Sequence, residues 1–203
     1  MLINRSVRAG CAGIAGAAAL CAALLSAPSP ALADGDDTPL MNLVALTSQR
    51  LALAAPVARW KWANHHPITD TQREAALLAD VERQARAAGV DPAFARTFFK
   101  DQIEASKEVQ SALFEQWRKA KPPEGSPPDL ATTIRPALDR LTPSMIAGLA
   151  RVEPLRDAPD CPIRLAHSVQ NWKSMTRYDA SETGPLMTAL AHVCSSGGVG
   201  SVS

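Results

Sequence analysis

The chain has 203 residues, with 21 Lys and Arg against 20 Asp and Glu, which gives a formal net charge of +1. Because the charges are balanced and no basic run occurs, the chain lacks the electrostatic footprint of a nucleic-acid-binding protein, and we expect no nucleic-acid partner. Hydrophobic residues make up 46% of the chain, which is enough to bury the core of one domain.

The N-terminal segment has the pattern of a secretory signal peptide. Arg5 and Arg8 precede an uncharged run of 17 residues from Ala9 to Leu25, and Ala31-Leu32-Ala33 fits the small-x-small cleavage rule. We therefore expect residues 1–33 to be removed and the protein to be exported, to a periplasm or to the medium. A membrane anchor is the alternative, since about 20 residues span a bilayer. The small residues and the cleavage site favour the signal peptide, so no membrane association is expected after cleavage.

The cysteines predict one disulfide. Two of the four cysteines lie in the predicted signal peptide, which leaves Cys161 and Cys194. An isolated pair in an oxidising compartment is typical of a disulfide, and this one closes a loop of about 33 residues and contributes ~3 kcal/mol. No CxxC pair occurs and no Cys and His residues have zinc spacing, so we expect no metal site.

Apolar residues at helical spacing predict an all-α domain over residues 34–195 and a disordered tail over 196–203. The expected helices span 39–63, 70–89, 92–120, 131–152 and 160–195. Pro56 should bend the first helix or make it locally irregular, Gly89 should end the second, and Asp91 should cap the third. Four prolines and a glycine make 121–130 a loop. The buried stripe expected on the third helix is Phe94, Phe98, Ile103, Val109 and Phe114.

Several polar residues share helix faces. Arg50 and Lys61 are 11 positions apart, which at about 100° per residue places them within about 20° of one another around the helix. Ser106 and Gln110 are one turn apart on the third helix. Converging Arg and Lys side chains favour a ligand that carries carboxylates, which guanidinium groups bind in a bidentate manner.

Each of these residues also has a structural interpretation. Thr71 and Glu74 match the capping box T-x-x-E, while Asp70 is a competing N-cap. Arg50 and Lys61 can be solvated, as most Lys and Arg residues on helices are. The pattern alone therefore predicts an exported helical protein and leaves anion binding open.

The ordered series of these residues resembles the active-site pattern of the AroQ-class chorismate mutases. The stretches SQRLALAAPVARWKWANHHPITDTQRE and FFKDQIEASKEVQSALFEQW are similar to the exported, gamma-type members. The resemblance runs from about Leu43 to Cys194 and includes DLATTIRPALDRL, in which Arg135 matches after a one-residue shift in the preceding loop. It implies a single-domain helical bundle of this type, with a C-terminal helical extension tied by the Cys161–Cys194 disulfide, and a homodimer.

The resemblance also implies an isomerase that converts chorismate to prephenate, a step of aromatic amino acid biosynthesis in the shikimate pathway, by a pericyclic (Claisen) rearrangement without a cofactor. By this analogy, Arg50, Arg73 and Arg135 engage the two substrate carboxylates. Ser106 helps to hold the ring carboxylate.

The remaining roles concern the reacting ether and the ring hydroxyl. By the same analogy, Lys61 and Gln110 donate to the ether oxygen as the C–O bond breaks. Glu74 accepts from the ring hydroxyl, with Asp70 close to it. Two other functions stay open at this point, an isochorismate pyruvate lyase and an exported helical binding protein without activity. The export signal and the C-terminal extension argue against the lyase, whose members are usually short and cytosolic.

Overall fold

The structure, a computed structural model, describes residues 36–176 and 180–198. The predicted signal peptide and residues 199–203 of the predicted tail lie outside the described residues, and both stay predictions. From Asp36 onward the chain forms one compact unit, and every regular element in its described part is helical. The expected all-α fold is confirmed.

The first expected helix is divided in two. α1 spans Thr38–Ala52 and α2 spans Ala54–Ala63, with Leu53 at the break. Pro56 has no N–H to donate to the carbonyl of Ala52, and its ring crowds that carbonyl, so the helix is interrupted one turn before the proline. The irregularity predicted from Pro56 is confirmed.

α3 spans Thr71–Ala88, and its start decides between the two capping interpretations. The backbone N–H of Arg73 donates to Oδ1 of Asp70 at 3.1 Å, and the N–H of Asp70 donates to Oε1 of Glu74 at 3.3 Å. Asp70 is therefore the N-cap, and Glu74 reaches back to it. Thr71 is the first helical residue, so the box predicted from Thr71 is wrong. Gly89 ends the helix with φ 74°, as expected, because glycine adopts this conformation without strain.

α4 spans Pro92–Lys119 and begins at Asp91, whose Oδ1 accepts from the N–H of Ala93 at 2.9 Å. The stripe predicted on this helix is confirmed only in its first half, where Phe94 and Phe98 are buried. In the second half the buried positions include the polar Gln110, because this part of the helix faces a polar cavity described below. The other three residues of the predicted stripe are only partly buried: Ile103, Val109 and Phe114.

The proline-rich segment is a loop as far as Asp129, as expected. Arg59 of α2 holds this loop, since its Nη2 donates to the carbonyl oxygens of Glu124 and Gly125 at 3.1 and 3.2 Å. A π-helical turn, η1 (Leu130–Ile134), then leads directly into α5 (Arg135–Val152), which is followed by the 3₁₀ turn η2 (Glu153–Leu155).

The single helix expected over 160–195 is wrong. α6 spans Cys161–Thr176, α7 spans Ala180–Ala189, and turns follow from Leu190 onward. A continuous helix would separate Cys161 from Cys194 by roughly 50 Å. The disulfide between them, with a Cα–Cα distance of 5.9 Å, requires the chain to turn back, and it confirms the predicted pair. Beyond it, the N–H of Ser195 donates to the carbonyl of Arg156 at 3.0 Å.

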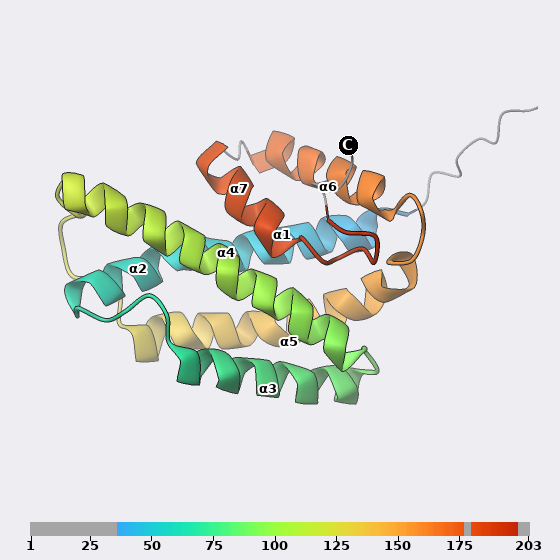
Figure 1. The fold of residues 1–203 in the computed structure, drawn as a ribbon, viewed down its shortest axis with the longest axis horizontal. Helices are drawn as coiled ribbons and strands as arrows, with labels where there is room; N and C mark the ends of the chain where they lie inside the picture. Colours follow the sequence, from blue (N-terminus) through green and yellow to red (C-terminus); the bar gives the residue numbers. More distant parts are fainter. Residues whose placement is uncertain (1–35, 177–179, 199–203) are drawn as a thin grey trace, which may run out of the picture. The chain divides into compact units, whose positions relative to one another are not determined.

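The helices pack around α1 and α4, which run through the middle of the bundle. α1 packs against α5 and α6, whereas α4 packs against α2, α3 and α7, and α3 also packs against α5 (Figure 1). The largest fully buried side chains include Leu40, Leu43, Phe98, Phe99 and Leu149.

The packing explains the apolar composition of α1 and α2. By length and composition alone, the 26 residues of Thr38–Ala63 are long and apolar enough to cross a membrane. Leu40, Leu43 and Val44, however, are 0% exposed because they form the core of the bundle. Core helices of globular proteins have this composition as well.

Replacing both Cys161 and Cys194 with alanine should lower the free energy of unfolding by about 3 to 4 kcal/mol, because the unfolded chain regains the entropy of a loop of 33 residues. Thermal unfolding followed by circular dichroism should show a decrease in Tm of roughly 10 °C. A reductant should lower the Tm of the wild-type protein by the same amount and should leave the Tm of the double variant unchanged. Equal Tm values for the oxidised wild type and the double variant would show that the disulfide does not stabilise the fold.

Candidate active site

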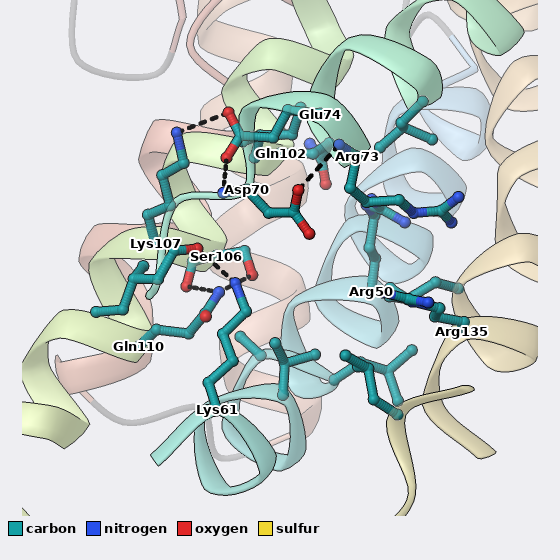
Figure 2. A pocket seen from close by; sticks show the side chains of 18 of the residues that line it. Arg50, Lys61, Asp70, Arg73, Glu74, Gln102, Ser106, Lys107, Gln110 and Arg135 are labelled. Carbon is teal, nitrogen blue, oxygen red and sulfur yellow. Dashed lines mark hydrogen bonds and ion pairs between the residues drawn. The ribbon is translucent and has the colours of Figure 1, made fainter. Parts of the chain in front are cut away.

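The site residues predicted from the sequence all line one cavity. It opens between α1, α2, α3, α4, η1 and α5 and holds about 920 Å³, including space open to solvent. Figure 2 shows Arg50 and Arg135 on one side of it, and Lys61, Ser106 and Gln110 on the other. The predicted residues that line the cavity are Arg50, Lys61, Asp70, Arg73, Glu74, Ser106, Gln110 and Arg135.

Arg50 is the most unusual of these residues. It lies in the last turn of α1, and its Nη1 is buried without a hydrogen-bond partner in the described part of the chain. Burial, with a further contribution from the charge of Arg73, lowers the pKa of Arg50 to about 10, while Asp139 acts in the opposite direction. The guanidinium lies 5.6 Å from the ring centroid of Phe99, which offsets part of this cost. A buried donor without an acceptor is suited to an anionic ligand.

Lys61 lies in the last turn of α2 and is only 8% exposed. The break at Leu53 separates it from Arg50, yet both residues still line the cavity. Its Nζ donates to the backbone carbonyl of Ile68, in the turn before α3. Burial lowers the pKa of Lys61, and the carboxylates of Asp70 and Glu74 oppose that shift. Lys61 is therefore a buried ammonium held at the cavity wall.

Arg135 begins α5 immediately after the π turn. Its backbone N–H donates to the carbonyl of Leu130, five residues earlier, so this turn holds one residue more than an α turn. Arg73, the third predicted guanidinium, also lines the cavity but donates to Oδ1 of Asp139 at 3.0 Å.

Ser106 and Gln110 lie one turn apart on α4, as their spacing predicted. The Nε2 of Gln110 donates to the hydroxyl and the carbonyl oxygen of Ser106 at 3.0 and 3.1 Å. The Oε1 of Gln110 is buried and has no partner in the described part of the chain. As it stands, the amide donates within its own helix, so it must turn over before its N–H can reach a ligand.

Three polar residues of the cavity were not predicted from the sequence. Lys107 pairs with Glu74, its Nζ lying 2.9 Å from Oε2, and Asp139 pairs with Arg73. The side chain of Gln102 donates to the carbonyl of Ala189 at 2.7 Å, which joins the cavity wall to α7. Sequence spacing contained a signal for Asp139, which lies one turn after Arg135. Glu74, the cavity partner of Lys107, and Ala189, the partner of Gln102, lie on other helices.

The charges of the cavity favour a dianion. Five cationic side chains and three carboxylates line it, which gives a formal balance of +2. Among the described residues, no three His, Cys, Asp or Glu side chains are grouped so that they could hold a metal ion. The arrangement can bind two carboxylates through guanidinium groups and can place an ammonium group against a third polar atom.

Comparisons with known proteins identify the family of the chain. A family model described as "Chorismate mutase type II" matches residues 41–111, which include seven of the eight predicted residues. A secreted chorismate mutase of Mycobacterium tuberculosis is 32% identical over 175 residues, which cover 84% of this chain and 86% of that protein. A secreted chorismate mutase of Mycolicibacterium smegmatis is 34% identical over 142 residues, which cover 69% of this chain and 77% of that protein. Both relatives are named as secreted proteins, which confirms the expectation of export.

A solved structure extends the agreement to the fold. The crystal structure of a chorismate mutase from Burkholderia thailandensis is 68% identical, covers 77% of this chain and 99% of its own, and superposes with a TM-score of 0.76. The chain belongs to the type II, or AroQ-class, chorismate mutase family.

Proposed function

We propose that the protein is an exported isomerase that converts chorismate to prephenate in the cavity between α1 and α5. The observation that carries this proposal is the buried Nη1 of Arg50, which has no partner in the described part of the chain, in a cavity with a formal balance of +2. Chorismate has two carboxylates and matches this balance. The reaction breaks one C–O bond and forms one C–C bond within the substrate, so no proton or covalent intermediate has to be carried by the protein.

Binding restricts the flexible substrate to a compact conformer. Arg50 and Arg135 lie on one side of the cavity and engage the carboxylates, together with Arg73 and with Ser106 at the ring carboxylate (Figure 2). Arg73 exchanges part of its contact with Asp139 for the ligand. Holding both carboxylates brings the two reacting carbons together, which removes much of the entropic part of the barrier.

Charge develops on the ether oxygen as the C–O bond breaks. Lys61 donates to this oxygen from one side, and Gln110, after its amide has turned over, donates from the other. Both donors are buried, so they act in a site with little water, where such stabilisation is strongest. Glu74 accepts from the ring hydroxyl, with Asp70 beside it.

The wider assignment rests on the family resemblance. We infer that the product enters aromatic amino acid biosynthesis and that the protein forms a homodimer, with no nucleic-acid or membrane partner after cleavage of the signal peptide. The destination after export, a periplasm or the medium, also stays a prediction.

Turnover of chorismate by the mature, oxidised protein tests the function directly. Loss of the diene absorbance should accompany formation of prephenate, which acid converts to phenylpyruvate. Lys61→Ala should lower kcat by about 10²- to 10³-fold, since one preorganised donor to a developing oxyanion contributes about 3 to 4 kcal/mol. Lys119→Ala, an exposed lysine at the end of α4, is the matched control and should keep kcat within about twofold.

Two results would contradict this proposal. Absence of turnover by the folded wild-type protein would exclude the mutase function, and pyruvate release from isochorismate would favour the lyase instead. Normal kcat in Lys61→Ala would leave the function intact but reject the geometry assigned to Lys61.

The pH dependence follows from which donors titrate. Gln110 donates at any pH, so kcat/KM should be flat from about pH 5 to pH 8. Lys61 must be protonated to donate, and burial lowers its pKa from 10.5, so kcat/KM should fall as the pH rises through that lowered value. The bound dianion favours the ammonium, so kcat should fall at higher pH than kcat/KM. A steep loss with an apparent pKa near 6 would be incompatible with Gln110 as the donor.

Arg50→Met should separate binding from stability. Loss of the charged donor should raise KM by about 10- to 100-fold. The free energy of unfolding of the ligand-free variant should nevertheless exceed that of the wild type by about 1 kcal/mol or more, because an apolar side chain replaces a buried, unpaired charge. Chemical denaturation measures the second effect, and Arg151→Met, an exposed arginine of α5, should change neither quantity. A less stable Arg50→Met variant would show that Arg50 supports the fold instead.

A further inference from the structure

Lys107 lies inside the cavity, yet the proposed function assigns it no role. It directly follows Ser106 on α4, and its side chain is only 20% exposed. The Nζ donates to Oε2 of Glu74 at 2.9 Å and to Oε1 of Glu104 at 3.1 Å. Glu104 is 62% exposed and does not line the cavity, so Lys107 is joined to one carboxylate in solvent and to one within the site.

Glu74 is held at both of its carboxylate oxygens. Oε1 accepts from the N–H of Asp70 at the start of α3, and Oε2 accepts from Lys107 on α4 (Figure 2). Each carboxylate oxygen can accept more than one hydrogen bond. Glu74 can therefore accept from a ligand hydroxyl without releasing either partner.

The charges around Glu74 make Lys107 its direct cationic partner. Within the described residues, Glu74 and Lys107 form the only ion pair of Glu74, whereas Arg73 is paired with Asp139. Burial acts to lower the pKa of Lys107, but the hydrogen bonds to Glu74 and Glu104 and the charges of these carboxylates together raise it, so Lys107 stays protonated at neutral pH. The charged groups that line the cavity together with Glu74 are Arg50 on α1, Lys61 on α2, Asp70 at the N-cap of α3, Arg73 on α3, Lys107 on α4, and Arg135 and Asp139 on α5.

We propose that Lys107 is the positioning residue of the ring-hydroxyl subsite, an inference that rests on the proposed function. It holds the Glu74 carboxylate oriented towards the cavity, so that Glu74 accepts the hydrogen bond of the substrate hydroxyl. The alternative is that Lys107 only contributes one positive charge to a cavity that binds a dianion.

Lys107→Met should lower kcat/KM by about 10- to 100-fold, the loss expected when a hydrogen bond to a charged group is removed. Lys100→Met, at an exposed lysine of the same helix, removes the same charge and should keep kcat/KM within about twofold. Lys107→Gln carries the same expectation if the methionine variant does not fold.

A double-mutant cycle with Glu74→Gln separates the two roles. If Lys107 acts through Glu74, Lys107→Met should change kcat/KM by less than about threefold in the Glu74→Gln protein. Equal losses in both backgrounds would overturn the proposal in favour of a simple charge effect. Wild-type turnover is measured in the same series, so failure of the proposed function is recognised separately from failure of this inference.

Discussion

The site depends on keeping a guanidinium inside a helical bundle without a carboxylate bonded to its buried end. Nη1 of Arg50 has no partner in the described residues, and the ring of Phe99 compensates only in part. Such a group is costly in a protein interior, and apolar packing of α1 on α5 and α6 supplies the free energy that retains it. The charge is thereby fixed before a ligand arrives, so binding an anion requires little reorganisation.

The C-terminal extension supports this arrangement from behind α4. That helix carries Ser106, Lys107 and Gln110 on its cavity side and packs against α7. Gln102 donates to the carbonyl of Ala189, the last residue of α7, and the disulfide fixes the segment that follows. α4 is thus held on two sides, by α3 at the cavity and by α7 away from it. Without the contact with α7, α4 would be freer to shift, and its three cavity residues would move with it.

Local signals in the sequence predicted the parts of the structure that short-range physics determines. Gly89 and Asp91 placed helix ends correctly because their backbone conformations and caps depend on neighbouring residues. The return of the chain after α6 was not predictable from periodicity, since the constraint is a bond between residues 33 apart. Partners such as Lys107 with Glu74, or Arg73 with Asp139, depend on how α4 and α5 pack against α3, and spacing along one helix does not contain that information.

The start of α3 shows why the capping and the ligand-binding interpretations of one sequence are compatible. Asp70 caps the helix with its Oδ1, and Glu74 returns a hydrogen bond to the N–H of Asp70 through Oε1. Both carboxylates nevertheless line the cavity, and Oε2 of Glu74 reaches Lys107. The cap fixes the orientation of side chains that would otherwise rotate freely at an exposed helix end. A structural interaction at the helix terminus therefore provides the preorganisation that a binding site requires, and the two roles reinforce one another.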